Sequence, residues 1–161
     1  MLRSLFAAIA VLFIAIHARP SAAQSARASY VDVYEYFTED AQFDAWYSLR
    51  TRLEADFDDL CGDTFCEGDW SNITPLRLRC SVQRGSGRIG RCVWSFAASN
   101  EEIDAHTGAI AVETHAWECA LPLASHTTID ALLAALAGDG PLQTPLPGTG
   151  RSIYDGLGDC L

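Results

Sequence analysis

One stretch, 76-LRLRCSVQRGSGRIGRCVWSF-96, restricts the fold more than any other part of the chain. Apolar residues occupy alternate positions on both sides of the turn signal at 85–87, a pattern typical of two half-buried antiparallel strands. Folding the strands about Ser86 predicts cross-strand pairs that are all apolar: Leu76 with Phe96, Leu78 with Trp94, and Cys80 with Cys92. The stretch therefore predicts a β-hairpin with one face in a core.

The chain has six cysteines, all after residue 60, and an even number in an exported protein indicates disulfides. Residues directly opposite on one face of a hairpin lie close enough to bridge. A second pair of cysteines, Cys61 and Cys66, has only four residues between them and predicts a small loop that ends a helix. The remaining cysteines, Cys119 and Cys160, would join the third strand to the C-terminus. The expected bonds are Cys80–Cys92, Cys61–Cys66 and Cys119–Cys160.

The first 23 residues have the order of a secretory signal peptide. Arg3 precedes an apolar run at 5–16, and Pro20 is followed by the small residues 21–23. The run is shorter than the about 20 residues that span a bilayer, so a retained anchor is the weaker alternative. We expect a secreted or periplasmic protein without stable membrane insertion after cleavage.

Acidic residues dominate the charge of the chain. It has 21 Asp and Glu against 11 Lys and Arg, a net charge of −10, and two of the arginines lie in the predicted signal peptide. Such a chain has no general attraction for nucleic acid or for anionic membranes. Nucleic acid is therefore not an expected partner.

Periodicity elsewhere predicts two helices and a third strand. Apolar residues at three-to-four spacing indicate a long amphipathic helix, and a shorter stripe indicates a second one. The expected elements are a helix from an N-cap at Thr38 to Leu60, strands near 75–83, 88–99 and 109–121, a helix from Thr127 or Thr128 to Gly138 with a Thr127/Asp130 capping box, a crossing loop at 138–151, and a final helical turn near 153–157.

This order predicts an α+β fold: an N-terminal helix, a three-stranded antiparallel meander, a second helix and a short C-terminal helical turn, stapled by disulfides. The expected organisation is a signal peptide at 1–23, an N-terminal arm or short strand at 24–37, and a single domain at 38–161. The hairpin also contains GSGRIG at 85–90. A strand follows these glycines where a dinucleotide site needs a helix, so they are interpreted as turn residues.

The stretch 61-CGDTFCEGDWSN-72 raises the question of a metal site. An EF-hand alignment starting at Asp56 fails, because Leu60 falls where a ligand belongs and Cys61 where glycine is needed. A different calcium site built from Asp63, Glu67 and Asp69 stays an alternative to a solvated acidic loop that faces the arginines of the hairpin. No other cofactor is expected.

Five arginines lie on or beside the hairpin: Arg77, Arg79, Arg84, Arg88 and Arg91. By strand alternation Arg77 and Arg79 point away from the core, where they would bind an anionic ligand or an acidic partner, or form an ordinary exposed face. Trp70 lies outside the apolar periodicity and is a candidate exposed contact residue.

The sequence thus favours an exported binding domain that acts without catalysis, through the loop 62–72 with Trp70 beside Arg77 and Arg79. It contains neither a G-x-S-x-G nor an H-x-x-x-H motif. A small secreted hydrolase with a spatially assembled site, and a calcium-stabilised module, are the alternatives.

Overall fold

The structure is a computed structural model that describes residues 29–161, apart from the side chain of Asp69. The predicted signal peptide and the start of the segment 24–37 lie outside the described residues. Within the described part, no helix is both long and apolar enough to cross a membrane.

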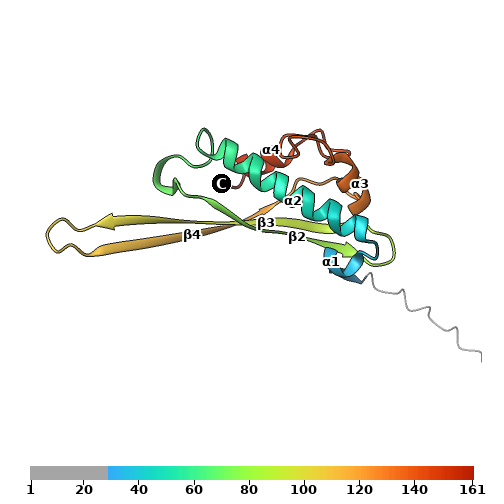
Figure 1. The fold of residues 1–161 in the computed structure, drawn as a ribbon, viewed down its shortest axis with the longest axis horizontal. Coiled ribbons are helices and arrows are strands. Elements are labelled where there is room, and N and C mark those ends of the chain that lie inside the picture. The colour runs from blue at the N-terminus through green and yellow to red at the C-terminus, as the bar shows by residue number, and fades with distance from the viewer. Residues whose placement is uncertain (1–28) are drawn as a thin grey trace, which may run out of the picture.

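The fold is α+β, as predicted, with a four-stranded antiparallel sheet in chain order (Figure 1). Helices α2, α3 and α4 lie on one face of the sheet and leave the other face of β3 and β4 uncovered. The elements are β1 Tyr30–Asp32, α1 Val33–Tyr36, α2 Asp40–Cys61, the 3-10 turn η1 Gly68–Trp70, β2 Thr74–Gln83, β3 Ile89–Ile103, β4 Ile110–Ala120, α3 Ile129–Ala135 and α4 Ile153–Gly158.

The sheet has one strand more than the predicted three-stranded meander. The segment before the long helix adds β1, which pairs antiparallel with the end of β2, and the single turn α1. The side-chain Oδ1 of Asp32 caps this turn by accepting a hydrogen bond from the Tyr34 N–H at 3.0 Å. Val33 and Phe37 are buried, so this segment joins the core.

The register of β2 and β3 follows the prediction in its centre, where Leu78 faces Trp94 and Cys80 faces Cys92. The predicted pair of Leu76 and Phe96 is wrong. A register shift between Pro75 and Arg77 places Pro75 opposite Phe96, and the Leu76 side chain is 53% exposed. One extra residue in a strand turns the following side chain to the opposite face, which alternation alone does not reveal.

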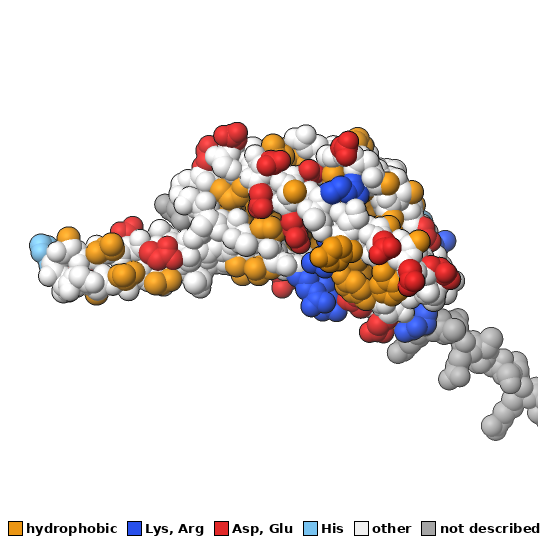
Figure 2. All heavy atoms as spheres, in the orientation of Figure 1, with side chains coloured by type: hydrophobic (Ala, Val, Ile, Leu, Met, Phe, Trp, Pro, Cys, Tyr) orange, Lys and Arg blue, Asp and Glu red, His pale blue; other side chains and the backbone are white. Residues whose placement is uncertain are grey.

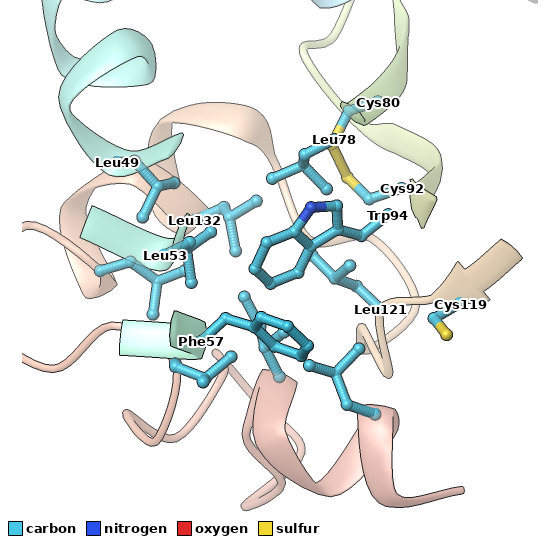
Figure 3. Close-up of a cluster of buried hydrophobic side chains, with 14 of the residues drawn as sticks. Leu49, Leu53, Phe57, Leu78, Cys80, Cys92, Trp94, Cys119, Leu121 and Leu132 are labelled. Atoms are coloured by element: carbon cyan, nitrogen blue, oxygen red, sulfur yellow. A yellow bond between two sulfur atoms is a disulfide. The ribbon is translucent and has the colours of Figure 1, made fainter. Parts of the chain in front are cut away.

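The core lies between α2 and the covered face of the sheet (Figure 3). Trp46, Leu49, Leu53 and Phe57 recur every three or four residues along α2 and are fully buried or nearly so. The ring centroids of Phe57 and Phe96 are 5.0 Å apart. Helical and strand periodicities therefore meet in a single core.

The predicted start of the first long helix is wrong, whereas that of the second is confirmed at Thr128. Helix α2 begins after Glu39 and not after Thr38, because the Gln42 Oε1 accepts from both of their backbone N–H groups, at 3.4 and 3.2 Å. Helix α3 begins after Thr128, whose hydroxyl oxygen accepts from the Ala131 N–H at 3.2 Å. The predicted capping box of Thr127 and Asp130 is wrong: the Thr127 hydroxyl donates to the Ala124 carbonyl, and Asp130 accepts from Gln42. Helix α3 ends at Ala135, before Gly138.

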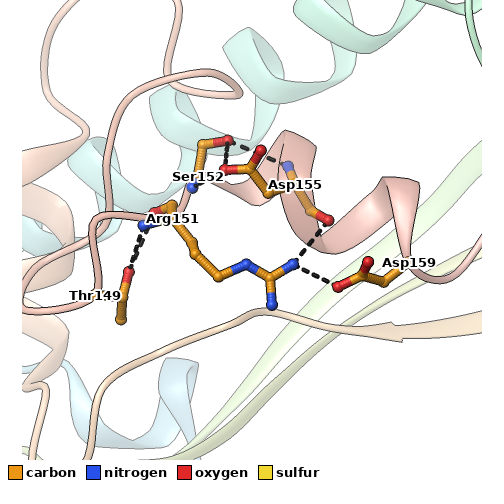
Figure 4. Close-up of polar contacts among 5 residues, drawn as sticks. All are labelled: Thr149, Arg151, Ser152, Asp155 and Asp159. Atoms are coloured by element: carbon orange, nitrogen blue, oxygen red, sulfur yellow. Dashed lines mark hydrogen bonds and ion pairs between the residues drawn. The ribbon is translucent and has the colours of Figure 1, made fainter.

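The C-terminal segment is held by polar contacts as well as by a disulfide (Figure 4). Ser152 and Asp155 form a capping box at the start of α4, and Arg151 pairs with Asp159. In the preceding loop Leu142 and Leu146 are buried, so the predicted crossing loop is ordered against the core.

Three disulfides join the pairs that the sequence predicts: Cys61–Cys66, Cys80–Cys92 and Cys119–Cys160. Their Cα–Cα distances are 4.9, 4.1 and 5.6 Å. They terminate α2, join β2 to β3, and join β4 to the C-terminus. Together they fix a domain whose core is covered by helices on one side only.

The lengths of the closed loops predict how much each bond stabilises the fold. Cys119 and Cys160 are 41 residues apart, whereas Cys61 and Cys66 are five apart. In the chain-entropy model, replacing the first pair by serine lowers the free energy of unfolding by about 4 kcal/mol and replacing the second by about 2 kcal/mol. Urea unfolding of the two double variants tests this order. Equal losses would contradict it.

Candidate binding surface

Strands β3 and β4 continue beyond the helices as a projecting hairpin, defined here as residues 100–115 (Figure 1). The prediction ended the second strand near residue 99, whereas β3 runs to Ile103. The turn is closed by Asp104, whose Oδ1 accepts from the N–H groups of His106 and Thr107 at 2.7 and 3.0 Å. These bonds lower the pKa of Asp104. Gly108 has φ +70°, a backbone conformation that favours glycine.

The two faces of the projecting hairpin differ in chemistry. Ile103 faces Ile110, and Val112 is the next residue along the same face; their side chains are 70%, 63% and 60% exposed. The opposite face carries Glu102 and Glu113. Figure 2 shows hydrophobic and acidic side chains on the hairpin, a pale blue histidine at its tip, and no Lys or Arg on the part in view.

The apolar side of the hairpin is continuous with the uncovered face of the sheet, called here the outer face. Successive pairs along it are Ser99 with Thr114, Ala97 with Ala116, Ser95 with Glu118, and Val93 with Ala120. These residues alternate with buried ones such as Trp94 and Phe96, and so point away from the core. The outer face is a long strip of mostly small side chains with a large apolar patch at its tip.

The base of the projecting hairpin is braced by the loop 62–72. The ring of Trp70 lies 5.4 Å from His115 and 6.0 Å from Trp117, measured between centroids. Next to it, the Asn72 Oδ1 accepts from the Ser99 N–H at 2.9 Å. Trp70 is half-buried, so the expectation of an exposed contact residue is not met; the residue packs under the hairpin.

The disulfide Cys61–Cys66 holds the start of this loop as predicted. The Cys66 N–H donates to the Cys61 carbonyl at 2.7 Å, and Phe65 stacks on Phe57 with centroids 5.9 Å apart. The loop is thereby attached to the core at one end and to the hairpin at the other.

Arg77 and Arg79 lie on the outer face, as predicted, and are exposed. Trp70 packs against the side of β4 that bears Trp117, which is the helix-covered side, so the structure does not bring the three predicted binding residues together. Arg79 pairs with Asp32, with Nη2 to Oδ2 at 2.6 Å, and not with the acidic loop. In the described part of the chain no carboxylate lies within 4.0 Å of the Arg77 guanidinium.

The pKa of Asp32 reflects this contact. Partial burial raises it, but the hydrogen bond from the Tyr34 N–H and the guanidinium of Arg79 outweigh that effect, so the pKa lies below its usual value. The contact fastens β1 and the start of α1 to β2. It also leaves Arg79 with its charge matched inside the molecule.

A shallow hollow of about 530 Å³ occupies the end of the outer face farthest from the hairpin tip. Its lining includes Tyr30, Asp32, Glu35, Arg79, Arg91 and Val93. The ring of Tyr30 lies over Gly90, where a Cβ atom would come within 2.7 Å of the ring. Gly90 therefore permits the ring to lie flat against the sheet.

The candidate calcium ligands do not form a described site. Asp63 and Glu67 are exposed in the loop, and the side chain of Asp69 lies outside the described residues. Among the side chains that the structure describes, no three from His, Cys, Asp and Glu are grouped to hold a metal ion. His115, the histidine nearest the loop, contacts two tryptophans.

Comparison with protein-family models, with curated proteins and with solved structures finds no match to this chain.

The apolar patch of the projecting hairpin was not predicted from the sequence. Ile103, Ile110 and Val112 stand in the opposite phase of alternation to the buried Trp94 and Cys119, which places them on the face away from the core. Alternation identifies which residues share a face, but it does not show that helices leave this face uncovered.

Replacing Asp32 tests the contact that holds β1. Asp32→Asn keeps the capping oxygen and removes the charge. Because the folded pKa is below the unfolded value of about 3.9, the charge stabilises the fold above that pH and its contribution is lost as the pH falls through the folded pKa. We expect the variant to lose about 1 kcal/mol near neutral pH and nothing in strong acid. Urea unfolding at both pH values measures this, and a loss independent of pH contradicts it.

Replacing Trp70 tests the brace. In Trp70→Ala, loss of two ring contacts should increase amide hydrogen exchange in residues 100–115 by about tenfold, since each aromatic contact contributes about 0.5–1.5 kcal/mol. Trp70→Phe, which keeps a ring, is the matched control. Unchanged exchange in the alanine variant would show that the hairpin stands without the loop.

Proposed function

We propose that the protein is an exported, disulfide-stapled binding domain that acts without catalysis and makes contact through the outer face of its projecting hairpin. The observation that carries this proposal is the exposure of Ile103, Ile110 and Val112 together at the end of a braced hairpin. Three disulfides in a domain of this size support an oxidising compartment, either secreted or periplasmic.

Burial of the apolar patch formed by these three side chains would stabilise a complex with a partner. Full burial of one aliphatic side chain contributes about 1.5–3 kcal/mol, and three that lie side by side on one face can be buried by a single apolar surface. The hairpin is already paired along its length, so binding would order few additional residues. A preformed hairpin with exposed aliphatic residues therefore suits docking onto a protein.

The arginines and acids bear on the chemistry of that partner. The projecting hairpin carries Glu101, Glu102, Asp104 and Glu113 and no Lys or Arg. A partner with an apolar surface and basic residues at its rim would match it. The exposed Arg77, opposite Ser95 in the middle of the outer face, is the residue that would bind an anionic group.

A capture experiment from the native secreted fraction tests the proposal. The bait is the wild-type protein, and the variant replaces Ile103, Ile110 and Val112 by serine. We expect the wild type to retain a protein that the variant loses, because the variant removes the apolar contact area but leaves the strand pairing.

The matched control replaces Glu102, Ala111 and Glu113, on the opposite face of the same hairpin, by serine. This control should retain the same protein. If the two triple variants behave alike, or if neither differs from the wild type, the outer face of the hairpin is not the contact surface.

A further inference from the structure

We infer that the outer face docks a second copy of this chain, antiparallel and face to face, so that the hairpin tip of each copy lies over the hollow of the other. This inference rests on the proposed function, for which it names the partner. Its basis is the distribution of charge, side-chain size and apolar surface along the outer face.

The outer face carries few of the acids of an acidic chain. Of the 21 acids, four lie on this face or line its hollow: Asp32, Glu35, Glu101 and Glu118. Three arginines share it, Arg77, Arg79 and Arg91. Two copies with a net charge of −10 each repel one another, and the near balance of acids and arginines on this face reduces that repulsion.

The arginines of this face lie away from the hairpin tip, in the company of Asp32 and Glu35, whereas an acid without a neighbouring arginine lies toward the tip. Its arginines lie on β2 and at the start of β3, and no Lys or Arg occurs in residues 92–150. Glu101 lies toward the tip. Arg91 and Glu101 are each five residues from Phe96 along β3, or roughly 17 Å at about 3.3–3.4 Å per residue. A twofold axis at that level places Glu101 of each copy over Arg91 of the other, which satisfies both contacts at once.

The same axis passes through the smallest side chains of the face. Ser95, Ala97 and Ala116 flank the level of Phe96 and point outward. Small side chains allow two sheets to approach closely, and aligned sheets pack about 10 Å apart. No described helix lies over this part of β3 and β4, so the approach is open (Figure 1).

The apolar ends also correspond. With Glu101 over Arg91, Ile103 of one copy falls over Ile89 of the other, next to Gly90, where the ring of Tyr30 lies. Tyr30 is 50% exposed and lines the hollow of about 530 Å³. The dimer would thus cover exposed aliphatic residues at the tip with an exposed aromatic ring at the far end, twice by symmetry.

Sedimentation and light scattering of the disulfide-intact protein test this inference. The wild type should show a concentration-dependent dimer. Glu101→Arg and Arg91→Glu should each weaken dimerisation at least about tenfold, because each places like charges opposite one another in two symmetric contacts. The double variant, with the charges exchanged, should recover the dimer, and this recovery excludes misfolding as the cause.

Glu102→Arg is the matched control: it makes the same change one residue away, on the opposite face, and should leave the dimer intact. A protein that is monomeric at every concentration overturns the inference, as does a dimer that Glu101→Arg leaves unchanged. If that monomer still captures another protein through Ile103, Ile110 and Val112, the proposed function stands without it. If the serine variant of those three residues changes neither dimerisation nor capture, the result contradicts both the proposed function and the dimer.

Discussion

The pairing of β2 with β3 is the constraint on which the rest of the structure depends. Leu78 opposite Trp94, and Cys80 bonded to Cys92, fix which side chains enter the core. A shift of β2 by one residue would turn its side chains to the opposite face and send the arginines inward. Because the register holds, α2 can place Phe57 against Phe96, while Arg77 and Arg79 are left on the uncovered face.

Strands β3 and β4 extend beyond the helices that cover one face of the sheet. The helices bury one face as far as Ala98, and beyond it both strands continue with no buried residue up to Cys119. An isolated two-stranded hairpin is marginally stable in water. This one is supported at its base by Trp70 and Asn72, so that the loop after Cys66 acts as a brace. The exposed isoleucines at the tip face each other across the hairpin but do not join the buried core, which is why we propose that they bind a partner.

Alternation and helical spacing predicted much of this molecule: the centre of the hairpin, the buried stripe of α2 and all three disulfide pairs. They failed where the signal was not periodic. A bulge before Arg77 exposed Leu76. The short strand predicted as one alternative for 24–37 is present as β1, although its three residues are too few to show a period. Trp70 is half-buried, and a lone aromatic in a loop carries no information about the strand it packs against.

The central claim is that residues 100–115 form a stiff, preformed hairpin that carries its apolar face away from the body. Nuclear magnetic resonance of the labelled protein tests it most directly. The account predicts cross-strand contacts between Ile103 and Ile110 and backbone order parameters near those of the body, about 0.85. Order parameters below about 0.6 along the hairpin, with no contact between those two residues, would contradict it.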